Sequence, residues 1–251
     1  MAGFAAYVGI DYSGAATPET RLPGLAVYRA EPGGEPAPVA PPAGRNWTRA
    51  ELHHWLAGQL AAEPTLAGLD FAFGFPAAYL DRHGLADWDA FLTDFRDHWP
   101  TDAPGATVEA LRAGNPRAGS AHELRLCERW TPSAKSVFRF DVQGAVAKSS
   151  HAGLPWLLRL RRELGDAVHC WPFDGWRPPS GCSLVAEVYP AQFKRRYPHA
   201  GRDSHQQDAY AVARWLGEAD DLGRLERYLA PPLTAGEAAL AAREGWILGV
   251  G

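Results

Sequence analysis

Three short apolar segments of this chain each end at an acidic residue, and this repeated pattern constrains the fold more than any other feature. The segments are 5–11, 66–71 and 182–188, with Asp11, Asp70 and Glu187 at or near their ends. Continuous apolar runs of this length are typical of strands that are buried on both faces of a sheet. We therefore expect an α/β fold in which buried strands carry carboxylates to one edge.

Helical patterns separate and follow these segments. Thr48 and Glu51 form a capping box ahead of apolar residues at helical spacing, which predicts a helix over about 49–61. Further helix starts are indicated by Ser120 with Glu123, by Pro155, by Ser204 with Gln207, and by Thr234 with Glu237. We expect one α/β domain over 1–251, with strands near both ends of the chain and a helical insertion over about 72–182.

Four carboxylates are candidate ligands for a divalent cation: Asp11, Asp70, Glu187 and Asp208, the last of which lies in the first turns of the helix after Ser204. A buried unpaired carboxylate costs several kcal/mol, so acids that converge need a cation. Oxygen ligands suit Mg²⁺ or Mn²⁺, and two such ions about 3.5–4 Å apart support phosphodiester hydrolysis. Each acid taken alone is more typical of a solvent-facing strand end than of a metal site, but the shared pattern favours a metal site.

The order of these residues resembles the ribonuclease H-like fold and, more narrowly, the DUF429 family of predicted ribonuclease H-like nucleases. The matching segments are 9–14 (GIDYSG), 68–76 (GLDFAFGFP), 135–138 (KSVF), 171–176 (WPFDGW), 187–190 (EVYP), 205–209 (HQQDA) and 244–249 (EGWILG). The resemblance implies a mixed five-stranded sheet with flanking helices. It also implies that Asp11, Asp70, Glu187 and Asp208 are catalytic metal ligands.

His205 departs from the family pattern, which often has a second acid three residues before Asp208. Residues three apart on a helix share a face, so both side chains can point at one site. A neutral imidazole is a poor Mg²⁺ ligand but can bind a transition metal, which would favour Mn²⁺. An ordinary exposed histidine at the start of the helix fits the sequence equally well.

The polar residues Lys135, Ser136 and Arg139 form a cluster suited to contacting phosphates, and Ser13 beside Gly14 is a weaker signal of the same kind. They belong to a chain with a net charge of −4, which excludes a wholly basic surface. The segment 112–162 is nevertheless basic, with ten Lys and Arg against three acids. We expect any nucleic-acid contact, to DNA or RNA, to use this segment.

The cysteine and hydropathy patterns bear on the compartment. Cys127, Cys170 and Cys182 form an odd set without CxxC spacing, as expected of a reduced cytoplasmic protein. No apolar run approaches the roughly 18 residues of a membrane helix, and the first ten residues do not predict a signal peptide. We therefore expect a cytoplasmic protein that does not contact a membrane.

Three function classes remain open at this point. The leading hypothesis is metal-dependent phosphodiester hydrolysis of nucleic acid. The second is a non-catalytic module that binds nucleic acid or nucleotide and retains the four acids without catalysing a reaction. Failure of the protein to bind divalent ions would favour this second class. A phosphotransferase of the actin and sugar-kinase type needs a second Gly-rich phosphate loop and a duplicated domain, and neither is visible in the 251 residues.

Overall fold

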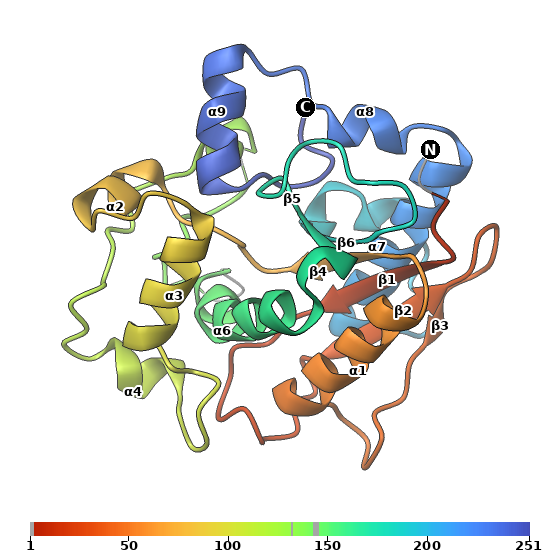
Figure 1. Ribbon diagram of the computed structural model, residues 1–251. Helices are drawn as coiled ribbons and strands as arrows, with labels where there is room; N and C mark the ends of the chain where they lie inside the picture. The colour runs from red at the N-terminus through yellow and green to blue at the C-terminus, as the bar shows by residue number, and fades with distance from the viewer. Residues whose placement is uncertain (1–2, 132, 143–145) are drawn as a thin grey trace.

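Figure 1 shows the computed structural model of the chain, which describes residues 3–131, 133–142 and 146–251. A mixed sheet forms its centre, with the strand order β3-β2-β1-β4-β6-β5. Strands β1, β4, β6 and β5 are parallel, whereas β2 and β3 pair antiparallel at the β1 side. The strands are β1 (Ala6–Asp11), β2 (Ala26–Ala30), β3 (Ala37–Pro38), β4 (Thr65–Asp70), β5 (Val168–Trp171) and β6 (Ser183–Glu187).

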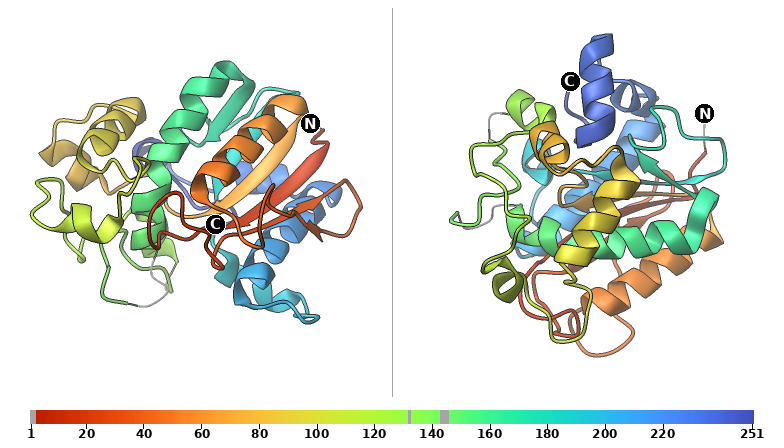
Figure 2. Two further views of the ribbon diagram at one scale, coloured as in Figure 1. Left: turned by 90° about the horizontal axis from the view of Figure 1, so that it is seen from below. Right: turned by 60° about the vertical axis from the view of Figure 1, so that its left-hand side comes forward.

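Helices cover both faces of the sheet, which gives three layers (Figure 2). The helices are α1 (Arg49–Ala62), α2 (Ala77–Arg82), α3 (Trp88–His98), α4 (Val108–Arg112), α5 (Leu126–Trp130), α6 (Ala147–Leu164), α7 (Ser204–Asp221), α8 (Leu225–Leu229) and α9 (Ala235–Glu244). One core cluster joins α1 and α6 to one face of the sheet, and another joins α7 to the opposite face. Within the described ranges, every helix lacks the length or the hydropathy needed to cross a bilayer.

Local signals set the helix starts. The predicted capping box at Thr48 is confirmed, because its side chain accepts from the Glu51 N–H while Glu51 accepts from the Thr48 N–H. The box at Thr234 and Glu237 is confirmed in the same way. The start of α7 was predicted one residue late: its cap is Asp203, paired with Gln206, rather than Ser204 with Gln207.

The sheet has six strands, so the expected count of five is wrong. The additional strand is β5, which pairs parallel with β6 at the edge of the sheet. Its four residues are all buried and lie within 72–182, which the sequence predicted to be helical. A four-residue segment that includes His169 is too short to show a periodicity, which explains why this strand was missed.

Two predicted helix starts in the insertion are wrong. Pro155 does not open a helix but lies inside α6. It has no N–H to bond the His151 carbonyl one turn earlier, and the Thr101 hydroxyl donates to that carbonyl instead, at 2.7 Å. Ser120 and Glu123 do bond each other, at 2.9 Å, but they form a turn, and α5 begins only at Leu126.

Two glycines allow α7 to lie directly on the sheet. A Cβ at Gly9 would lie 2.1 Å from the Ala209 carbonyl oxygen, and one at Gly68 would lie 2.7 Å from Val212 Cγ1. Any side chain at these positions would push the helix away from β1 and β4. The close approach fixes Asp208, in the second turn of α7, beside the ends of these strands.

Candidate metal centre

Three carboxylates from two strands and one helix meet at the edge of the sheet. Asp11 shares the α7-facing side of β1 with Gly9, and Asp70 shares that side of β4 with Gly68, because alternate residues of a strand point to the same face. Asp11 also lies opposite Asp70 in the register of the two strands. With Asp208 of α7 they form a group, here called the acid triad, in which one carboxylate oxygen from each residue lies within 4.8 Å of those from the other two.

Burial and close packing oppose the ionisation of Asp70 and Asp11. Burial raises the pKa of Asp70 well above its usual range, and the charges of Asp11 and Asp208 add to the effect. Burial also raises the pKa of Asp11, although its hydrogen bond with His205 acts in the opposite direction. Three ionised carboxylates at this distance repel one another, so a bound cation would stabilise the group.

Two basic side chains neutralise part of this charge. His205 Nδ1 lies 2.5 Å from Asp11 Oδ2, and this hydrogen bond raises the pKa of the imidazole. Lys194 Nζ donates to Asp208 Oδ2 at 2.9 Å. Oδ1 of Asp208 is buried and has no hydrogen-bond partner among the residues that the structure describes. A donor set made only of carboxylate oxygens, one of them unpartnered, fits Mg²⁺ or Mn²⁺.

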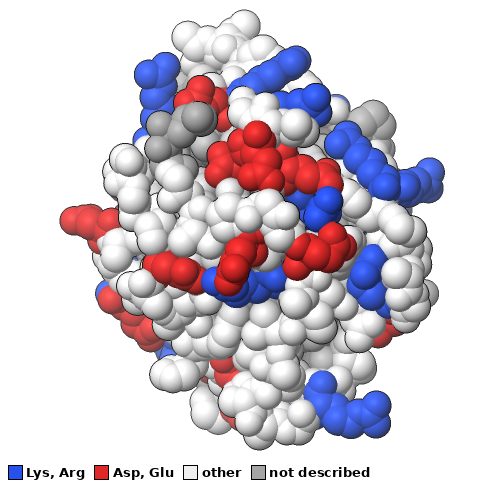
Figure 3. All heavy atoms as spheres, turned by 90° about the vertical axis from the view of Figure 1, so that its right-hand side faces the viewer, with Lys and Arg blue, Asp and Glu red and all other residues white. Residues whose placement is uncertain are grey.

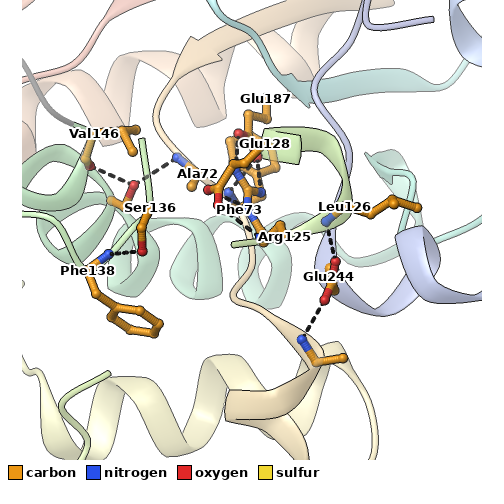
Figure 4. A network of polar contacts seen from close by, with 12 residues as sticks. Ala72, Phe73, Arg125, Leu126, Glu128, Ser136, Phe138, Val146, Glu187 and Glu244 are labelled. Carbon is orange, nitrogen blue, oxygen red and sulfur yellow. Dashed lines mark hydrogen bonds and ion pairs between the residues drawn. The ribbon is translucent and has the colours of Figure 1, made fainter. Parts of the chain in front are cut away.

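Glu187, expected as a fourth ligand, is engaged elsewhere (Figure 4). It lies opposite Leu69 in the register, on the face of the sheet that packs against α1 and α6 rather than α7. Its two oxygens accept from Arg125 Nη1 and Nη2 at 2.7 and 2.6 Å. One of them also accepts the Phe73 N–H at 3.0 Å. Both oxygens of this carboxylate are thus hydrogen-bonded, and Glu187 is not one of the three acids that meet.

The acid triad opens into a cavity of about 520 Å³, whose wall also includes Glu187 and His205. Of the predicted phosphate-binding residues, Ser13 and Lys135 line this cavity, but Ser136 and Arg139 do not. Ser136 is buried and accepts the Phe138 N–H at 3.2 Å, which assigns it to a turn in the core. Arg139 pairs with Asp141 instead.

The loop after β1 is held by residues that the sequence analysis did not single out. The buried guanidinium of Arg49 donates to the carbonyls of Ser13 and Ala15 at 3.1 and 2.7 Å. A Cβ at Gly14 would lie 2.0 Å from the Lys148 carbonyl, so this loop rests on the first turn of α6. Arg125 and Lys194 were also missed. Arg125 bonds Glu187, 62 residues further along the chain, and Lys194 bonds Asp208, 14 residues further along. Contacts at such separations give no periodic pattern in the sequence.

The opposite end of β1 has a different surface. Figure 3 views the molecule from that side, where acidic side chains gather near the middle of the face and basic ones lie around them. Such a face offers no continuous basic surface to a nucleic acid.

Comparisons of the chain with protein-family models, with curated proteins and with solved structures found no match.

Proposed function

We propose that this protein is a divalent-metal-dependent phosphodiesterase that acts on nucleic acid, with the metal held by Asp11, Asp70 and Asp208. The observation that carries the proposal is the acid triad, in which each residue brings one carboxylate oxygen within 4.8 Å of the other two, beside an open cavity. The order of the elements also supports it. A hairpin with Asp11, a helix, a strand with Asp70, and a late helix with Asp208 follow in the order that the ribonuclease H-like resemblance implies.

The chain supplies a rigid frame for this chemistry. A divalent cation bound by the acid triad would polarise a phosphoryl oxygen and lower the pKa of a bound water. Asp11 and Asp70 are fixed by neighbouring strands, and Asp208 by a helix in direct contact with both. Lys135 and Ser13 belong to the cavity wall, and we propose that they bind phosphate oxygens. His205 donates a hydrogen bond from Nδ1 to Asp11 at the edge of the group.

The first experiment replaces Asp11 by Asn. The metal-free variant should be as stable as the wild type or more stable, because the substitution removes repulsion within the acid triad. Mn²⁺ should raise the melting temperature of the wild type but much less that of the variant, since a ligand bound only by the folded state stabilises it. Hydrolysis of single- and double-stranded DNA and RNA should be lost in Asp11→Asn.

The matched control is Asp97→Asn, the same exchange at an exposed position of α3, which should leave both responses unchanged. Equal Mn²⁺ shifts in wild type and Asp11→Asn would mean that the ions bind elsewhere. Metal binding at the acid triad without hydrolysis of any of the four substrates would favour the non-catalytic binding module.

A further inference from the structure

Lysine is rare in this chain, and its positions are not scattered. Only three of the 25 basic residues are lysines: Lys135, Lys148 and Lys194. Lys135 and Lys148 line the cavity of the acid triad, and Nζ of Lys194 lies 2.9 Å from Asp208 Oδ2. A general preference for arginine in the composition does not explain why all the exceptions lie at one site.

Arg125, which lines the same cavity, shows how an arginine contacts a carboxylate at this site. Arg125 takes both oxygens of Glu187 with two nitrogens of its planar fork, and its side chain is only 1% exposed. Such bidentate pairing occupies both oxygens of the carboxylate and leaves fewer lone pairs for a metal ion. Lys194 instead contacts one oxygen of Asp208 and leaves Oδ1 without a partner in the described chain. Lysine thus neutralises an acid while leaving it able to bind a metal.

The three lysines differ in how firmly they are held. Lys148 pairs with Glu109, an acid outside the triad, whereas Lys135 is exposed and has no ion pair within the described residues. Lys194 follows β6 in a short 3-10 turn over Lys194–Arg196, and its side chain is 37% exposed. Its ammonium lies on a flexible four-carbon stem, and its partner Asp208 belongs to the cavity wall.

We propose that Lys194 is a displaceable counter-ion of the acid triad. It neutralises Asp208 in the metal-free protein. When a divalent cation is bound, its ammonium group turns to a phosphate oxygen in the cavity, where Lys135 and Lys148 provide further positive charge. This inference rests on the proposed function and defines the ligand of the site as a phosphate-bearing anion. It requires lysine, because an arginine at this position would capture both oxygens of Asp208.

The test compares Lys194→Arg with Lys194→Met by calorimetric titration with Mn²⁺ alone. The arginine variant should bind Mn²⁺ about tenfold more weakly than the wild type, the equivalent of one additional charge-assisted hydrogen bond to be broken. The methionine variant should bind Mn²⁺ at least as tightly as the wild type, because nothing competes for Asp208. With Mg²⁺ present, inorganic phosphate should bind more weakly to Lys194→Met than to the wild type.

Arg243→Lys is the matched control, because it exchanges the same two cations at an ion pair with Asp81 outside the cavity, and its Mn²⁺ affinity should not change. Without metal, the melting temperature of Lys194→Arg should equal or exceed that of the wild type. Weaker Mn²⁺ binding by this variant would then come from the arginine on Asp208 and not from loss of the fold. Equal Mn²⁺ affinity in Lys194→Arg and wild type, or equal phosphate affinity in Lys194→Met, would overturn the proposal. A wild type that binds no Mn²⁺ would refute the metal site itself.

Discussion

At the scale of single residues, His151 is a buried histidine whose surroundings keep it neutral. It lies among the rings of Phe75, Phe95 and Trp99, and its Nδ1 bonds the Ala147 carbonyl at 2.8 Å. Burial lowers the pKa of His151 to about 3, against an ordinary value of 6.5. Because the folded state does not bind the proton that the unfolded chain takes up, this residue makes stability depend on pH.

The sign of the dependence follows from the lowered pKa. The contribution of His151 is fully present above pH 6.5 and is lost as the pH falls towards 3, by about 1.4 kcal/mol per pH unit. His151→Phe should therefore reduce the loss of unfolding free energy between pH 6.5 and 5, as measured by urea denaturation. The same exchange at exposed His54 should leave the pH dependence as it is. An unchanged slope in His151→Phe would contradict the neutral, buried state.

At the scale of elements, the contact of α7 with β1 couples the fold to the candidate metal centre. Gly9→Ala places a methyl group 2.1 Å from the backbone of α7, so the helix must shift. We expect a loss of about 1–3 kcal/mol in unfolding free energy, as for other overpacked cores. The shift also moves Asp208 away from Asp11, so the Mn²⁺-induced rise in melting temperature should shrink.

Gly58→Ala provides the matched control for this exchange. Gly58 lies on the exposed side of α1, where an added Cβ meets nothing within 4 Å. Alanine should therefore stabilise the protein by about 0.5–1 kcal/mol and leave the Mn²⁺ response intact. If Gly9→Ala were as stable and as responsive as the wild type, α7 would not set the position of Asp208.

The elements also show what the sequence can and cannot predict. Strands β1, β4 and β6 and helix α1 were predictable, because their apolar runs and the capping box at Thr48 are local signals. The face on which Glu187 lies was not, since a run that is apolar at every position has no alternation to define its faces. The start of α6 was misplaced because the hydroxyl that compensates for Pro155 belongs to Thr101, far away in the chain.

At the scale of the whole molecule, buried ionic contacts fasten the insertion to the sheet. Arg125 joins Glu128 of α5 and Glu187 of β6, and Glu244 of α9 accepts the N–H groups of Ala77 and Leu126 (Figure 4). These contacts link segments up to 167 residues apart. Loosening them should therefore lower the stability of the whole fold.

Variants of Arg125 and Glu187 distinguish whether Glu187 acts as the ion-pair partner of Arg125 or as a metal ligand. Arg125→Met leaves this buried carboxylate unpaired and should cost about 3–5 kcal/mol of unfolding free energy, measured in urea. Adding Glu187→Met should recover part of the loss, but not all, because Glu128 also loses its partner. Since both oxygens of Glu187 are taken by Arg125, the double variant should keep the wild-type Mn²⁺ affinity. Loss of that affinity in a folded double variant would restore Glu187 as a metal ligand, as the sequence predicted.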